Sequence, residues 1–194
     1  MRVILHSDLN AFYAAVECLH QLDIRHKPVA VCGHQELRHG IVLAKNQLAK
    51  QYGVKTGDVI WQARQKAPGL IVVPPNFPLY QKFSQLVRSI YLQYTPNVES
   101  FGLDEAWLDL TQPDMTLEQG YIIAEEIRRR VKEEVGLTVS IGISWNKIFA
   151  KLGSDYQKPD AVTLITPENY RSLVWPLPAS DLLYVGPATS KKLA

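Results

Sequence analysis

Two adjacent carboxylates, Asp104 and Glu105, lie within the otherwise apolar stretch SFGLDEAWLDL. An unpaired carboxylate is costly to bury, so both must be solvated, paired with basic groups or bound to a cation. Neighbouring side chains of a straight strand point to opposite faces, so both can serve one ion only from a turn, and Gly102 gives the backbone that freedom. Asp8, at the end of the first apolar segment, joins them if the two strands are neighbours. The sequence therefore predicts three convergent carboxylates.

Three carboxylates suit a hard ion such as Mg2+, which shares its coordination shell with waters and substrate phosphates. Two such ions can activate an attacking oxygen and stabilise the leaving oxygen of an in-line displacement. The pattern is therefore typical of phosphoryl transfer with two Mg2+ ions. The alternative is that Asp104 and Glu105 are solvated turn residues and that Asp8 caps a helix, because acidic residues are common in both places.

The elements that would position these carboxylates alternate between strands and helices. Asn10 is the expected N-cap of a helix over 11–19, and Thr116 and Gln119 have the spacing of a capping box. Apolar periodicity predicts the other helices, and short apolar runs predict the strands. Further helices are predicted at 58–69, 77–94, 117–135 and 146–156, and one more ends near residue 53. Strands are predicted at 2–6, 27–33, 70–76, 97–101, 106–110, 137–144 and 161–165, and one more begins at residue 40.

This order of elements predicts an α/β (α+β) fold. The first strand and the strands after residue 97 would form a mixed sheet with two backing helices. Residues 11–76 interrupt this plan and predict a small separate lobe. The C-terminal VGPATSKKLA lies in a helical pattern without a stop signal, which suggests that the chain is part of a longer protein.

Composition bounds the class of protein. The 194 residues are 46% hydrophobic and 21% charged, which excludes a disordered or collagen-like chain. No apolar run approaches the roughly 20 residues needed to cross a bilayer, so we expect no membrane partner. Two cysteines, Cys18 and Cys32, provide no disulfide framework and favour a cytoplasmic protein, and Cys32, His34 and His39 fit no standard zinc motif. A net charge of +2 neither demands nor excludes nucleic acid.

Four stretches together resemble the Y-family DNA polymerases of the DNA polymerase IV type, which copy past damaged bases. They are SDLNAFYAAVE, GVKTG, LDEAWLDL and GISWNKIFAKLGSDYQKPDAV, in this order and spacing. The resemblance implies a palm at 1–10 and 77–166, fingers at 11–76 and the start of a thumb, with a partial helix-hairpin-helix, at 167–194. It also implies a low-fidelity, template-directed DNA polymerase of lesion bypass and DNA repair, which uses two Mg2+ ions to transfer dNMP to a primer 3'-hydroxyl.

The resemblance assigns roles to individual residues. Asp8, Asp104 and Glu105 match the family's catalytic, metal-binding carboxylates, with the backbone carbonyl of Leu9 as a further ligand. Tyr13 matches the steric gate that favours dNTP over rNTP. The other matches are Phe12, Ala44, Lys50 and Lys158 for the nucleotide, Ile41 and Leu43 for the roof over the templating base, and Gly186 and Ala188 for the DNA backbone.

These assignments have alternatives. Phe12 and Tyr13 could instead be core residues at a helix start, and Lys158 a solvated turn lysine. Many relatives have Asn-Tyr-x-x-Arg where this chain has Asn46, Gln47 and Lys50, so a planar phosphate fork is missing. For Lys147 and Lys151, four positions apart on one helix, we expect surface roles.

The implied partners are primer-template DNA, dNTPs and, through a C-terminal region absent from this chain, a sliding clamp. Two other functions remain open. A nucleotidyl cyclase could use a similar sheet and carboxylate pair but needs no template, and Tyr13 and the thumb-like C-terminus count against it. A polymerase-like accessory protein without activity would bind DNA but would not need all three carboxylates.

Overall fold

The computed structural model describes residues 1–33 and 40–193. The chain divides into two compact units, Met1–Asn10 with Leu86–Ala194, and Ala11–Gln85. We call them the first and second unit. Helix α4 (Phe77–Tyr91) contributes residues to both units, whereas the sequence places a boundary before the helix. His34 and His39, considered above as zinc ligands, lie outside the described residues.

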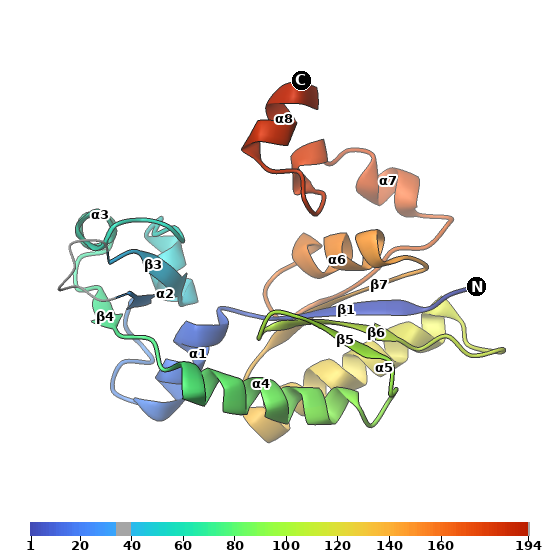
Figure 1. The fold of residues 1–194 in the computed structure, drawn as a ribbon, viewed down its shortest axis with the longest axis horizontal. Coiled ribbons are helices and arrows are strands. Elements are labelled where there is room, and N and C mark those ends of the chain that lie inside the picture. Colours follow the sequence, from blue (N-terminus) through green and yellow to red (C-terminus); the bar gives the residue numbers. More distant parts are fainter. Residues whose placement is uncertain (34–39, 194) are drawn as a thin grey trace. The chain divides into compact units, whose positions relative to one another are not determined.

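A mixed five-stranded sheet forms the centre of the first unit, as predicted (Figure 1). Its first strand is central, because β1 pairs antiparallel with both β6 and β7, while β7 pairs in parallel with β8. All six residues of β1 are buried. The order across the sheet is β5 (Val98–Phe101), β6 (Glu105–Asp109), β1 (Ile4–Leu9), β7 (Val139–Ser144) and β8 (Val162–Leu164).

The two predicted backing helices cover opposite faces of this sheet (Figure 1). Gly142 of β7 touches α6 (Lys147–Tyr156) so closely that a Cβ there would lie 2.0 Å from the Ala150 carbonyl oxygen. A Cβ at Gly120 of α5 (Leu117–Arg130) would instead contact the neighbouring residue of β7, Ile143, at 3.4 Å. Because successive strand residues point to opposite faces, α5 and α6 lie on different sides.

Local start signals predict one helix correctly and another incorrectly. Thr116 and Gln119 form the predicted capping box of α5. The predicted Asn10 cap is wrong, because α1 (Phe12–His20) begins after Ala11, whose φ is 51°. The Asn10 side chain instead donates to Ser140 Oγ at 2.9 Å and accepts from the Asp160 amide at 2.8 Å. Partners from distant segments have replaced the local hydrogen bond that a cap would make.

The second unit is built on a three-stranded sheet. Its strand order is β3 (Val42–Lys45), β2 (Val29–Cys32) and β4 (Ile71–Val73). The two faces of β2 enter separate apolar clusters, with Ala30 and Cys32 in one and Val29 and Val31 in the other. Helices α1, α2 (Gln47–Gln51) and α3 (Ile60–Lys66) also belong to this unit.

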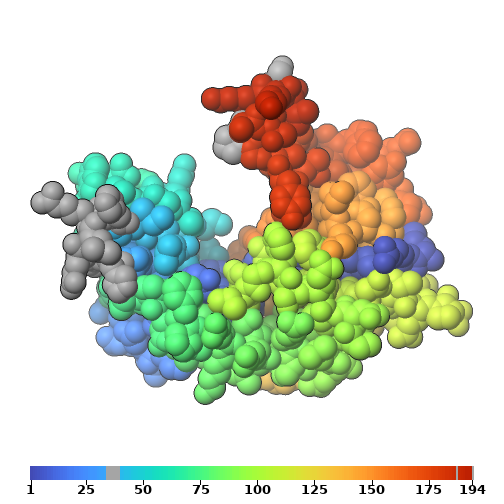
Figure 2. Space-filling model, in the orientation of Figure 1, coloured from blue at the N-terminus to red at the C-terminus, as the bar shows by residue number. Residues whose placement is uncertain are grey.

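The chain after β8 forms short helices: α7 (Tyr170–Val174), a 3-10 turn (Ala179–Asp181) and α8 (Pro187–Leu193). Val174 of α7 packs with Leu152 of α6 and with Ile165, so α7 lies against α6, and Figure 2 shows the orange-red atoms of this part of the chain beside the orange ones. In the part of the chain that is described, no helix has the length and apolar character needed to cross a membrane.

Candidate active site

Asp8 and Glu105 lie directly opposite each other on the antiparallel strands β1 and β6. Directly opposed residues share a face of the sheet, so their carboxylates point to the same side. Asp104 occupies the turn before β6, where Gly102 has a φ of 78°. The Leu9 amide donates a 2.9 Å hydrogen bond to the Asp104 carbonyl and ties the end of β1 to that turn. The structure thus brings the three predicted carboxylates to one end of the strand pair.

A buried lysine lies between two of these carboxylates. Lys151 of α6 places its Nζ 3.1 Å from Asp8 Oδ2 and 2.9 Å from Glu105 Oε2. It also contacts Asp155 Oδ2 at 3.1 Å, and only 9% of Lys151 is exposed. The surface role expected for Lys151 is therefore wrong. We use the name acidic site for Asp8, Asp104, Glu105, Lys151 and Asp155.

The two lysines of α6 differ because the helix rests on β7 through Gly142. Residues on the inner face of α6, such as Lys151, meet the sheet face that carries the carboxylates. Lys147 remains on the outside, as expected, with its Nζ 2.6 Å from Glu99 Oε1 and 4.3 Å from the centre of the Trp107 ring.

Lys158, the expected triphosphate contact, follows α6 and is half-buried. Its Nζ lies 2.6 Å from Asp8 Oδ2 and 2.7 Å from Asp155 Oδ1. Asp8 therefore receives two ammonium groups on one oxygen. A lysine held at the edge of the acidic site is well placed to meet a further anion that arrives there.

His6 is a member of this environment that the sequence reasoning missed. It precedes Asp8 by two residues on β1 and therefore shares its face, which is the signal that could have found it. Its Nε2 lies 3.1 Å from Glu105 Oε2, and its Nδ1 lies 2.8 Å from Ser154 Oγ. Burial is the main cause that lowers the pKa of His6, so the imidazole is neutral at physiological pH. The Ser154 hydroxyl donates its one hydrogen to the Lys151 carbonyl at 2.7 Å, so Ser154 links the imidazole to the turn of α6 that carries Lys151.

The adjacent carboxylates of Asp104 and Glu105 have opposite pKa shifts. Burial, followed by the negative charges of Asp8 and Glu105, raises the pKa of Asp104 to about 6. Burial alone would also raise the pKa of Glu105, but the close contacts of its Oε2 with His6 and Lys151 outweigh it and lower that pKa to about 2. Lys151 therefore offsets the cost of burial at Glu105, whereas the weaker influence of Lys158 does not offset it at Asp104.

The carboxylate oxygens of the acidic site are suitable donors for a hard cation, although in this structure those of Asp8 and Glu105 face Lys151. No group of three or more His, Cys, Asp and Glu side chains among the described residues is already arranged to hold a metal ion. Asp8 and Glu105 face Lys151 instead. Glu105 Oε2 is nevertheless buried, and it makes no well-aligned hydrogen bond with any described residue despite its close contacts with His6 and Lys151. A buried anionic oxygen with poorly aligned partners is a suitable ligand for Mg2+.

The predicted nucleotide residues at the start of α1 lie in the second unit, in a group that we call the aromatic cluster: Phe12, Tyr13, Phe77 and Tyr80. The Tyr13 and Tyr80 rings stack with centroids 4.4 Å apart and planes at 10°. Tyr80 in turn donates a 2.6 Å hydrogen bond to the buried Glu17 carboxylate. Phe12 is 3% exposed, so it has the core position that was its alternative, while Tyr13 is half-buried.

The other predicted residues are spread over both units. In the second unit, Ala44 and Leu43 of β3 are half-buried, Ile41 is 41% exposed, and Lys50 is exposed near the end of α2. In the first unit, Gly186 and Ala188 are exposed at the start of α8, and the Gly186 carbonyl accepts the Ser190 amide at 2.9 Å.

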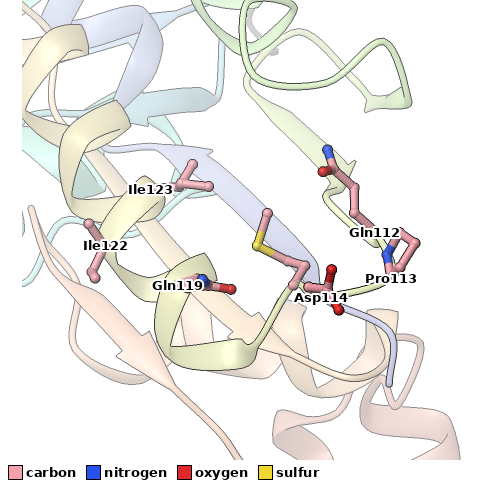
Figure 3. A pocket seen from close by; sticks show the side chains of 7 residues that line it. Gln112, Pro113, Asp114, Gln119, Ile122 and Ile123 are labelled. Carbon is pink, nitrogen blue, oxygen red and sulfur yellow. The ribbon is translucent and has the colours of Figure 1, made fainter.

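The first unit also has a surface pocket of about 450 Å3 that contains none of the predicted site residues (Figure 3). Gln112 and Asp114 approach it from the loop after β6, and Gln119, Ile122 and Ile123 line it from α5. Asp114 is the one acidic residue among those that line it. Among the described residues, the clustered acidic and basic side chains therefore lie at the acidic site and not at this pocket.

Known protein sequences agree with the resemblance seen above. The sequence model of the impB/mucB/samB family matches residues 7–155. DNA polymerase IV of Acetivibrio thermocellus is 59% identical over 192 residues, which cover 99% of this chain and 48% of that protein. DNA polymerase IV of Ralstonia nicotianae is 42% identical and covers 100% of this chain and 54% of that protein. The chain thus spans about half the length of these curated relatives.

Solved structures give the same picture. The insertion ternary complex of Dbh DNA polymerase matches 98% of this chain and 56% of that chain with a TM-score of 0.92 and 29% identity. The crystal structure of DinB from Sulfolobus solfataricus matches the same shares of the two chains with a TM-score of 0.90 and 29% identity. The fold predicted from the sequence is confirmed by these neighbours.

Proposed function

The chain belongs to the impB/mucB/samB family of Y-family DNA polymerases, and from this premise we propose that it is the catalytic half of a low-fidelity, template-directed DNA polymerase. The whole protein would transfer dNMP from a dNTP to a primer 3'-hydroxyl during lesion bypass and DNA repair. One observation carries the proposal: Asp8 and Glu105 form a cross-strand pair next to Asp104, within the residues that match the family.

Two Mg2+ ions are the proposed cofactors, held by the carboxylates of Asp8, Asp104 and Glu105 and by the Leu9 carbonyl. When bound, they would stabilise negative charge on the attacking and leaving oxygens of the displacement. Burial and the negative charges of Asp8 and Glu105 raise the pKa of Asp104, so a bound cation would stabilise the ionised carboxylate there. His6 would orient Glu105, and Lys158 would bind the triphosphate as a point charge.

The aromatic cluster would select the sugar of the incoming nucleotide. Tyr13 is the proposed steric gate, and its stacking on Tyr80 would hold the ring still enough to exclude a 2'-hydroxyl. Phe12 supports this helix start from the core. In the same unit, Ala44 and Lys50 would contact the nucleotide, and Ile41 and Leu43 would cover the templating base.

The remaining proposals concern the rest of the polymerase. Palm (1–10 and 77–166), fingers (11–76) and the start of the thumb (167–194) are the proposed domains, and Gly186 and Ala188 would contact the DNA backbone. Primer-template DNA and dNTPs are the proposed partners, with a sliding clamp bound through a region beyond this chain. The proposed location is the cytoplasm, whose reducing conditions suit the free thiols of Cys18 and Cys32.

Primer extension by the full-length protein tests the central proposal. We expect Mg2+-dependent addition of the template-specified dNTP, a loss of at least about a hundredfold in Asp8→Asn or Glu105→Gln, and unchanged activity in Asp114→Asn, an exposed carboxylate. Tyr13→Ala should increase the use of rNTPs relative to dNTPs. The same reactions without a template test the nucleotidyl cyclase, which would release a cyclic nucleotide.

The 194-residue chain gives a second test that separates the enzyme from the accessory protein. We expect it to bind dNTP only with Mg2+ and an intact Asp104. Binding of DNA without any Mg2+-dependent binding of dNTP, by a folded chain and by the full-length protein, would favour the accessory protein.

A further inference from the structure

Lys151 has a position in which a lysine is rarely found. It is 9% exposed, and its Nζ contacts three carboxylates, those of Asp8, Glu105 and Asp155, within 3.1 Å. Burial disfavours an ammonium group, but the charge of Asp8 and the close contact with Glu105 outweigh it and raise the pKa of Lys151. The residue is therefore a fixed positive charge inside the acidic site.

The opposed strands explain why a cation is needed there. Two like charges directly across an antiparallel pair repel each other, and Asp8 and Glu105 are such a pair. Lys151 contacts the Oδ2 atom of one and the Oε2 atom of the other. It therefore bridges the two strands at the point where their side chains would otherwise move apart.

We propose that the Lys151 ammonium is a built-in counter-cation, which holds Asp8 and Glu105 together in the metal-free protein and competes with metal ions for their oxygens. This inference rests on the proposed metal site. A carboxylate oxygen that faces an ammonium group at about 3 Å is less available to a divalent cation, because the two positive charges repel.

The third contact of Lys151, with Asp155, provides an alternative ion pair for the ammonium group when the oxygens of Asp8 and Glu105 bind a metal ion. Asp155 lies one turn further along α6, its side chain is 42% exposed, and it is not among the proposed ligands. A small rotation of the lysine side chain toward Asp155 would release Asp8 and Glu105 while one ion pair is kept. Binding of a metal ion therefore requires a change of partner rather than the exposure of an unpaired buried charge.

Lys158 does not have this role. It contacts Asp8 and Asp155 but does not bridge to the opposite strand, and its side chain is 27% exposed. Lys147, on the outer face of the same helix, pairs with Glu99 and has a side chain that is 44% exposed. Lys147 is therefore the matched control for a change of charge on α6.

The experiment measures Mn2+ binding to the 194-residue chain from the electron spin resonance signal of free Mn2+, a readout that needs no activity. We expect Lys151→Met to lower the Kd for Mn2+ about tenfold and Lys147→Met to leave it within about twofold of the original chain. Without metal, K151M should also melt below the original chain and regain stability when Mn2+ is added. An unchanged or higher Kd in folded K151M would overturn the proposal.

A second measurement uses the unaltered chain, so it does not depend on the folding of a variant. Lysine acetylation read by mass spectrometry should modify Lys151 faster with saturating Mg2+ than without it, because the side chain moves toward the exposed Asp155. Lys147 should react at the same rate in both conditions. Slower or unchanged modification of Lys151 with Mg2+ would count against its displacement and overturn the proposal.

Asp8→Asn separates this inference from the proposed function. Mn2+ binding that does not depend on Asp8 would refute the proposed metal site. It would also refute the role of Lys151 as a competitor of the metal ion. Asp8-dependent binding that K151M fails to tighten would leave the metal site in place and refute the role of Lys151 alone.

Discussion

The acidic site and the aromatic cluster each take residues from the short stretch Asp8 to Tyr13, but different forces hold them in place. Backbone contacts fix the acidic site: strand register sets Asp8 against Glu105, and the contact at Gly142 sets the height of α6. Side chains fix the aromatic cluster, where Tyr13 stacks on Tyr80. A site held by backbone cannot be adjusted without a change in the fold, whereas a packed cluster can be altered by single substitutions.

Among the substitutions considered, Gly142→Ala should have the largest effect, because it disturbs the backbone contact that positions the acidic site. The new Cβ would lie 2.0 Å from the Ala150 carbonyl oxygen and 2.4 Å from the Ser154 amide nitrogen, so α6 must move away from β7. We expect the free energy of unfolding to fall by about 3 kcal/mol or more. Urea unfolding followed by tryptophan fluorescence measures this, since Trp107, Trp145 and Trp175 lie in the same unit.

Gly33→Ala is the matched control for that substitution. A Cβ at Gly33 has no described atom within 4 Å, so we expect a change below about 0.5 kcal/mol. Equal stability of the two variants would show that α6 is free to shift, and the acidic site would then not be held by backbone.

Tyr80→Phe tests the aromatic cluster, which side chains hold in place. Its expected effect on stability is smaller. The substitution keeps the ring that stacks on Tyr13 but removes the hydrogen bond to Glu17, a carboxylate that is 5% exposed and otherwise accepts from Gln21 at 3.2 Å. Loss of a hydrogen bond to a buried charge should cost about 2 kcal/mol in thermal or urea unfolding. Tyr52→Phe, at a residue that is 54% exposed, should have no measurable effect.

The selectivity for the sugar of the nucleotide gives a second readout for Tyr80→Phe. Because the ring remains, we expect Tyr80→Phe in the full-length protein to keep its preference for dNTP over rNTP within about threefold. A large gain in rNTP use would mean that the hydrogen bond to Glu17, and not the stack alone, holds Tyr13 in place.

Asp104→Asn has an expected effect on stability that depends on pH and disappears in acid. The pKa of Asp104 is raised from its ordinary value of 3.8 to about 6, so the metal-free fold has its full stability from this group below pH 3.8 and loses it as the pH rises through about 6. The asparagine removes that loss. In EDTA, the variant should therefore gain stability over the original chain between about pH 4 and pH 7, by on the order of 2 kcal/mol.

Thermal unfolding at several pH values measures this difference, with Asp114→Asn as an exposed control. Glu105 should show the opposite sign, because its pKa is lowered from 4.5 to about 2 and its contribution disappears as the pH falls through that range. A stability difference between Asp104→Asn and the original chain that is constant with pH would contradict the assigned environment of Asp104.

Local patterns were sufficient to predict most of the fold. The turn at Gly102 followed from the need to orient two adjacent carboxylates, and the start of α5 followed from the spacing of Thr116 and Gln119. The order of strands and helices gave the mixed sheet with α5 and α6 as its backing helices. Each of these features depends on residues close in sequence or on a simple rule of alternation.

The errors concern residues whose partners lie far along the chain. Asn10 has the type and position of a helix cap but bonds to Ser140 and Asp160. Lys151 has the sequence context of a surface lysine, and its burial follows from the face of α6 that Gly142 receives. The assignment of Tyr13 as a gate came from family resemblance, and no local pattern distinguishes it from a core tyrosine.

The central position of β1 has a consequence for how the protein is made. Asp8 leaves the ribosome early, but its partner Lys151 is 143 residues away and Lys158 is 150 residues away. At a synthesis rate of about 5–20 residues per second, roughly 7 to 30 seconds separate the first carboxylate from its first ammonium partner. Glu105 also appears before both lysines, so a nascent chain that ends before α6 would hold two opposed carboxylates without a counter-ion. The chain should therefore pair β1 with β6 and β7 only after α6 has been synthesised, as one late and cooperative event.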